Sequence, residues 1–231
     1  TAPVMAKGLE DTVFYIFNRL ASLNEVGGEP IRFGASADSL HRWLAERAEQ
    51  FPHALTTLST HDTKRSEDVR ARINVLSEIP DDWFAAVERW TKQNHAALSS
   101  IEDREVPDHN ETYFLYQNLL GAWPLDPMDD EAYTNFRDRI REYMSKSLHE
   151  AKVHSSWMNP DPEYDGMVDR FIAAILDREQ NAEFLDDFLA FQKRISHHGA
   201  LNSLAQTLLK ITVPGVPDTY QRTELSDFSL V

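Results

Sequence analysis

His61 and Asp62 are the residues best placed to do chemistry, because they stand between an apolar, strand-like run and the start of a helix. Residues 54–60 can form the strand, and Ser66 is a preferred N-cap for the helix that follows. In parallel α/β sheets and barrels, side chains at the carboxyl ends of strands line the active site. The pattern predicts that Asp62 is an active-site carboxylate. The local alternative is that Asp62 caps a turn and His61 packs beside it.

A second strand end is predicted near the end of the sequence. Residues 209–213 read as a short buried strand, and the Pro-Gly-Val-Pro run at 214–217 predicts a rigid turn. The polar residues that follow are Asp218, Tyr220, Gln221 and Glu224. They form a second predicted lip, whose side chains could line a site or make structural hydrogen bonds.

The composition is that of a folded, soluble protein. The 231 residues carry a formal charge of −15, which would repel phosphate backbones and anionic lipids, so neither nucleic acid nor a membrane is an expected partner. No apolar run could span a bilayer and no signal core is present, which fits a cytoplasmic location. Cysteine, glycine-rich phosphate loops and HExxH motifs are absent from the sequence, so we expect no cofactor and no metal.

Helical periodicity dominates elsewhere. Ser36 predicts one helix start, and Asp81 and Asn110 predict two more. The apolar residues that recur three or four positions apart are Val13, Phe17 and Leu20; Leu40, Trp43 and Leu44; Val69, Ile73 and Leu76; Trp83, Val87 and Trp90; Tyr133, Phe136, Ile140 and Tyr143; Phe171, Ile172 and Ile175; and Phe184, Phe188 and Ile195. Such aromatic stripes are more typical of buried helix faces than of ligand platforms.

Several runs of the sequence resemble one family. STHDTKRSEDVRAR closely resembles a motif of the maltooligosyltrehalose synthases, which are members of the α-amylase superfamily. PVMAKGLEDTVFYIFNRLASLNEVGGEP and NSLAQTLLKITVPGVPDTYQRTELSDFSLV resemble the segments that precede this motif and close the barrel. LLGAWP and EAKVHSSW occur between them in the family order. The resemblance extends over nearly the whole chain.

The resemblance implies a mainly α fold made of a helical insertion and the last two strands of a (β/α)8 barrel. Residues 1–80 would hold the seventh strand and its flanking helices. Residues 81–199 would be the helical insertion, and residues 200–231 would hold the eighth strand. We therefore expect an excised, incomplete barrel fragment whose partner is the remainder of the parent barrel.

The resemblance also implies roles for the candidate site residues. Asp62 would bind sugar hydroxyls and favour the oxocarbenium-like transition state, with His61 as a neighbouring sugar ligand. The nucleophile and the acid, which retaining glycoside chemistry also needs, would lie before Thr1. Further candidate substrate ligands are Lys64, Arg65, Tyr220, Gln221 and Glu224. Lys64 and Arg65 could equally be solvated cations at the helix start.

The implied activity is an intramolecular transglucosylation that converts the reducing-end α-1,4 linkage of a maltooligosaccharide into an α,α-1,1 linkage, an isomerase reaction of trehalose biosynthesis. The fragment alone should be inactive. The alternatives are a non-catalytic helical interaction module and a hydrolase of the same superfamily. The sequence departs from the family at Arg222, where glycine is usual, and at Ser226, where tryptophan is usual.

Overall fold

The computed structural model describes residues 2–221 and 223–230, so Arg222 lies outside the described residues. The α-helices are α1 (Ala37–Gln50), α2 (Glu67–Val75), α3 (Pro80–Asn94), α4 (His109–Ala122), α5 (Asp130–Ala151), α6 (Pro162–Ile175) and α7 (Ala182–Thr212). The strands are β1 (Leu55–Thr56), β2 (Ser99–Ile101), β3 (Arg104–Val106) and β4 (Val216–Pro217). The mainly α fold class is thus confirmed. None of the described helices is long and apolar enough to cross a membrane.

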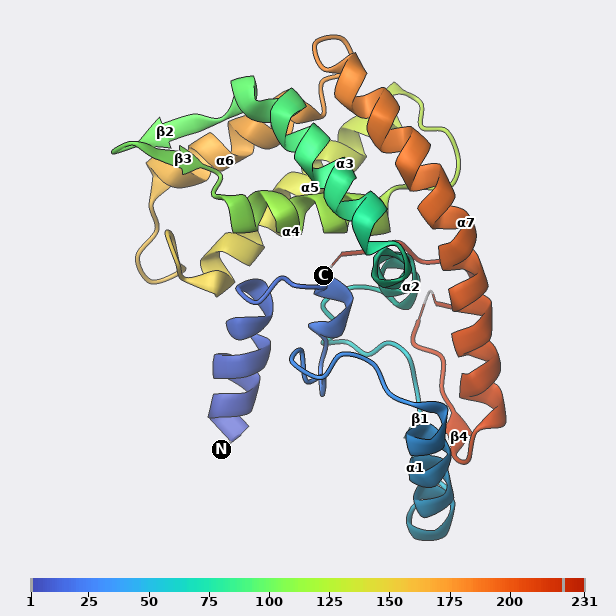
Figure 1. The fold of residues 1–231 in the computed structure, drawn as a ribbon. Helices are drawn as coiled ribbons and strands as arrows, with labels where there is room; N and C mark the ends of the chain where they lie inside the picture. Colours follow the sequence, from blue (N-terminus) through green and yellow to red (C-terminus); the bar gives the residue numbers. More distant parts are fainter. Residues whose placement is uncertain (1, 222, 231) are drawn as a thin grey trace.

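Helices α3 to α6 pack with the first half of α7 around an aromatic core, in the upper part of Figure 1. The Trp90 ring lies 5.4 Å from the rings of Tyr116 and Phe188 and 6.0 Å from Phe184. The predicted stripes of α5, α6 and the first half of α7 are buried here. Their interpretation as helix core is confirmed.

Helix α2 lies between this helical bundle and the strand pair β1–β4 (Figure 1). Two glycines let neighbouring helices approach it closely. A Cβ on Gly121 of α4 would lie 2.6 Å from Val69 Cγ1, and one on Gly199 of α7 would lie 2.5 Å from Arg72 Cγ. Helix α2 therefore packs directly against the backbones of α4 and α7 at these two glycines.

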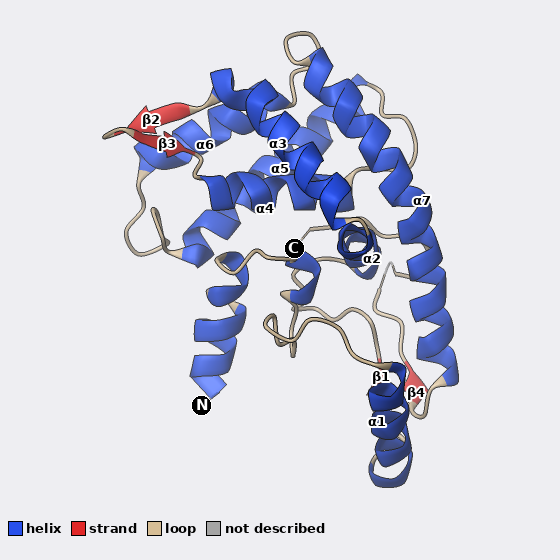
Figure 2. Ribbon diagram, in the orientation of Figure 1, coloured by secondary structure: helices blue, strands red, loops and turns tan. Residues whose placement is uncertain are grey.

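Strands are confined to two short pairs in the described part of the chain (Figure 2). β1 and β4 pair in parallel, with Leu55 opposite Val216 and Thr56 opposite Pro217. Arg47 of α1 fastens them, since its Nε donates to Pro214 O at 2.9 Å and its Nη2 to Thr56 Oγ1 at 2.8 Å. The carboxyl ends of β1 and β4, which are far apart in the sequence, therefore lie side by side.

The strand predicted at residues 209–213 is wrong. Residues 209–212 continue α7, Val213 is its C-cap, and the strand that follows is Val216–Pro217. A short apolar run does not distinguish a buried strand from a helix, and here it prolongs the leucine period of α7. The helix ends only before Pro214 and Gly215, and Gly215 has a φ of +133°.

The helix indicated by Val13, Phe17 and Leu20 does not form as one piece. A single wide helical segment covers Val4–Glu10, and 3₁₀ turns cover Val13–Tyr15 and Ala21–Leu23. The Asn24 side chain donates to the carbonyl oxygens of Phe14 and Phe17 at 2.9 Å, in competition with helical hydrogen bonds.

Helix starts follow the predicted chemistry in most places. Ser36 and Ser66 cap α1 and α2 as predicted, by accepting from the N–H groups of Ser39 and Val69. Helix α4 begins before Asn110, since Asp108 forms a capping box with Glu111. Helix α3 begins at Pro80, one residue before the predicted Asp81.

Candidate functional site

Asp62 lies on the loop that joins β1 to α2. Its side chain is 58% exposed, and its Oδ1 lies 3.7 Å from the Lys64 ammonium. The Asp62 N–H donates to Thr60 Oγ1 at 3.3 Å, and the neighbouring His61 is exposed. The loop thus presents an accessible carboxylate and an accessible imidazole beside a cation, an arrangement able to bind hydroxyl groups.

Lys64 lies beneath this carboxylate. Its side chain is only 6% exposed, and its Nζ donates to Asp11 Oδ1 at 2.7 Å. Burial tends to raise the pKa of Asp11, but hydrogen bonds from Lys64 and Lys7 outweigh it and lower that pKa. Lys64 is therefore a buried bridge between two carboxylates.

Arg65 is fully buried, and its guanidinium points into the protein. Its Nε donates to Asn118 Oδ1 at 2.8 Å, and its Nη1 donates to Asn24 O at 3.3 Å. The guanidinium carbon lies 5.0 Å from the centre of the Phe114 ring, within cation–π range. In this structure Arg65 joins the loop to α4 and the N-terminal segment.

The second lip passes the amino end of α2. Ser66 N–H donates to Ser229 O at 3.1 Å, and Asp227 N–H donates to Asp68 Oδ2 at 2.7 Å. The Asp62 loop and the segment after β4 are therefore both joined to the start of α2. Within the second lip, Tyr220 is half-buried and accepts a hydrogen bond at its hydroxyl from Gln221 Nε2 at 3.3 Å.

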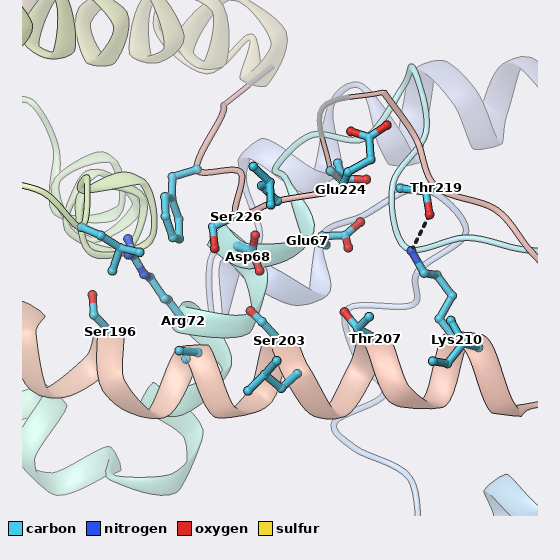
Figure 3. A pocket seen from close by; sticks show the side chains of 18 residues that line it. Glu67, Asp68, Arg72, Ser196, Ser203, Thr207, Lys210, Thr219, Glu224 and Ser226 are labelled. Carbon is cyan, nitrogen blue, oxygen red and sulfur yellow. Dashed lines mark hydrogen bonds between the residues drawn. The ribbon is translucent and has the colours of Figure 1, made fainter.

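A cavity of about 620 Å³ lies between α2, α7 and residues 219–228. Figure 3 shows Ser203, Thr207 and Lys210 of α7 facing Glu67 and Glu224 across it. Lys210 Nζ donates to Thr219 Oγ1 at 3.2 Å. Of the predicted site residues, the lining of this cavity includes Glu224 but not Asp62, His61, Lys64, Arg65, Tyr220 or Gln221.

Sequence reasoning missed a second polar cluster, which joins α4, α6 and the loop between α5 and α6. Glu111 accepts hydrogen bonds from the Asp108 N–H at 3.0 Å and from the Tyr164 hydroxyl. His154 Nε2 lies 2.9 Å from Asp108 Oδ2. Burial, reinforced by the Asp108 charge, raises the pKa of Glu111 to about 7. The Asp-x-x-Glu spacing of a capping box could have indicated Asp108 and Glu111. His154 and Tyr164 belong to distant segments, and no local pattern indicates them.

Comparisons with known proteins identify the relatives of this chain. A Mycobacterium tuberculosis protein provisionally named maltooligosyl trehalose synthase is 42% identical over 228 residues, 99% of this chain and 28% of the relative. A solved maltooligosyl trehalose synthase structure matches with a TM-score of 0.85 at 35% identity, over 99% of this chain and 29% of that one. Maltooligosyltrehalose synthase from Arthrobacter ramosus gives a TM-score of 0.80 at 35% identity, over 99% and 27%.

No protein-family profile matches the chain. The chain spans 28% of the length of the curated relative, so it corresponds to one segment of a larger protein there. Sequence identity of 42% and a common fold both extend over almost every residue of the chain. The chain therefore belongs to the maltooligosyltrehalose synthase family.

Proposed function

We propose that this chain is one part of a glucosylmutase that converts the reducing-end α-1,4 linkage of a maltooligosaccharide into an α,α-1,1 linkage. The proposal is supported by the match over 99% of the chain to relatives named maltooligosyl trehalose synthase, together with the exposed Asp62 carboxylate on the loop that follows β1. Neutral sugars suit a site that offers hydroxyl-binding groups and no phosphate-binding loop.

We further propose that β1 and β4 are the last two strands of an α-amylase-type (β/α)8 barrel. Their parallel pairing across the intervening residues 57–215 supports this, because sequential strands of such a barrel are parallel neighbours. Residues 1–80 would then be the seventh-strand segment, 81–199 the helical insertion and 200–231 the eighth-strand segment. The remainder of the barrel would be the partner of this chain and would cover the apolar face of α1, where Trp43 is 52% exposed.

In this proposal Asp62 stabilises the oxocarbenium-like transition state, His61 binds sugar hydroxyls near it, and Lys64 holds the Asp62 carboxylate from the buried side. Arg65 supports the loop from below, and Tyr220, Gln221 and Glu224 line the neighbouring strand end. The nucleophile and the general acid belong to the rest of the barrel, so the isolated chain should be inactive. The reaction breaks the terminal α-1,4 bond through a covalent glycosyl-enzyme. The released glucose then attacks that intermediate through its anomeric hydroxyl.

Replacing Asp62 in the larger enzyme tests the proposal. Asp62→Asn should lower kcat by at least about 100-fold, since it removes one charged group that acts in the transition state. Asp126→Asn, which alters an exposed carboxylate in the helical insertion, is the matched control and should leave kcat unchanged. Products from maltopentaose are separated by chromatography. Activity of Asp62→Asn within about tenfold of wild type would refute the assignment, and glucose as the main wild-type product would favour a hydrolase.

A further inference from the structure

We propose that Glu25 is the residue that positions Asp62, an inference that rests on the proposed function. Glu25 lies in the segment between the short N-terminal helices and α1, far from Asp62 in sequence. Its carboxylate accepts the Lys64 N–H at 2.8 Å through Oε1 and the Arg65 N–H at 3.2 Å through Oε2. Two consecutive amides of the catalytic loop therefore converge on one carboxylate.

This contact is partly buried and charge-assisted. The Glu25 side chain is 12% exposed, and the Arg70 Nε lies 3.8 Å from its Oε2. Hydrogen bonds from backbone amides to a carboxylate are about twice as strong as neutral ones. Removing the acceptor would leave the amides of Lys64 and Arg65 without a partner in a place where water hardly reaches, which is costly.

Glu25 is itself fixed in place. Gly28 N–H donates to Glu25 O at 2.7 Å, and a Cβ on Gly28 would lie 2.7 Å from that same oxygen. The next residue, Val26, donates its N–H to Glu25 Oε1 at 2.9 Å. The preceding Asn24 is anchored by its side chain to two carbonyl groups. The carboxylate is thus presented by a tight turn that only glycine at position 28 permits.

The two ends of the same loop are also joined to each other through Arg70. Arg70 donates to Leu58 O and to Arg65 O, and Ser59 Oγ donates to Glu67 Oε2 at 2.9 Å. On the carboxyl side of Asp62, Glu25 therefore joins the backbone of the loop to a distant segment of the chain, two residues after Asp62. Since a displacement of about 1 Å at a reacting group can cost about 100-fold in rate, losing this fastening should impair turnover more than substrate binding.

The test compares Glu25→Gln with Glu10→Gln in the larger enzyme. Glu10 is a suitable control because its Oε1 accepts the Gly27 N–H at 3.0 Å, in the same turn, without contacting the Asp62 loop. Glu25→Gln should lower kcat by about 10- to 100-fold with KM changed less than about threefold. Glu25→Asp, which keeps the charge but reaches less far, should be intermediate. Glu10→Gln should match wild type.

Amide hydrogen exchange of this chain gives a readout that does not depend on activity. Residues 58–66 should exchange at least about tenfold faster in Glu25→Gln and at the wild-type rate in Glu10→Gln. Faster exchange with normal kcat would overturn the inference, as would unchanged exchange. If Glu25→Gln fails to fold, the kinetics and the amide hydrogen exchange of Glu25→Asp test the inference instead. Full activity of Asp62→Asn would refute the proposed function, whereas normal turnover of Glu25→Gln beside an inactive Asp62→Asn refutes this inference alone.

Discussion

Replacing Glu111 by glutamine should remove a specific pH dependence from the stability of this chain. Glutamine keeps the shape of the side chain and can still accept the Asp108 N–H of the capping box. It cannot titrate. The ionisable groups around Glu111 are Asp108 at the start of its own helix, His154 in the loop between α5 and α6, and Tyr164 in α6.

The magnitude follows from the pKa of Glu111, which burial and the Asp108 charge raise from an ordinary 4.5 to about 7. Between these values the folded chain holds a proton that the unfolded chain has released. The free energy of unfolding should therefore fall as pH rises through this range and level off above about pH 7. At about 1.4 kcal/mol per pH unit, the loss between pH 5 and pH 8 is at most about 2 to 3 kcal/mol, because solvent still partly reaches the carboxylate.

Urea unfolding of wild type and Glu111→Gln at pH 5 and pH 8 measures this loss. The wild type should lose up to about 2 to 3 kcal/mol more than the variant between the two pH values. The side chains around position 111 are the same in both proteins, so the difference between their profiles isolates Glu111. Glu163→Gln, an exposed carboxylate change beside Tyr164, should behave as wild type. Profiles of wild type and Glu111→Gln that run parallel within about 0.5 kcal/mol would refute the reasoning.

Two core substitutions test the packing around α2 and α3. Gly121→Ala gains up to about 1 kcal/mol of helix propensity, but its Cβ would meet Val69 Cγ1 at 2.6 Å and Val69 O at 3.1 Å, so a net loss of about 1 to 3 kcal/mol is expected in urea unfolding. A stabilised variant would show that α2 and α4 can separate freely. Trp90→Ala should cost about 3 to 5 kcal/mol, since it empties the centre of the aromatic core. A cost below about 1 kcal/mol would mean that the surrounding rings close the gap.

Local chemistry made part of this structure predictable. Ser36 and Ser66 were readable as caps because a hydroxyl before a helix satisfies a free backbone N–H whatever the rest of the protein does. The stripe from Tyr133 to Leu148 was readable because a buried helix face repeats every three or four residues. Asp62 lies on an accessible loop between a strand and α2, as expected, although the strand covers only Leu55–Thr56 and not residues 54–60.

Contacts between distant segments were not predictable. The fastening of Lys64 by Glu25 joins residues 39 positions apart, and no local pattern signals it. The β2–β3 hairpin was missed because its turn, Glu102 and Asp103, adopts positive φ without the glycine that usually marks such turns. Residues 209–213 failed as a strand because apolar residues such as Leu209 and Ile211 fit a long helix equally well.

The 31 residues of α7 form one uninterrupted rod of about 46 Å. Its first half carries Phe184, Phe188 and Ile195 into the helical bundle, while its second half exposes Leu201, Leu204 and Leu208 and leads directly into β4. A boundary drawn between residues 199 and 200 falls in the middle of this rod. The bundle is therefore mechanically stiff at this junction, and a rigid-body tilt of the bundle would move β4 with it.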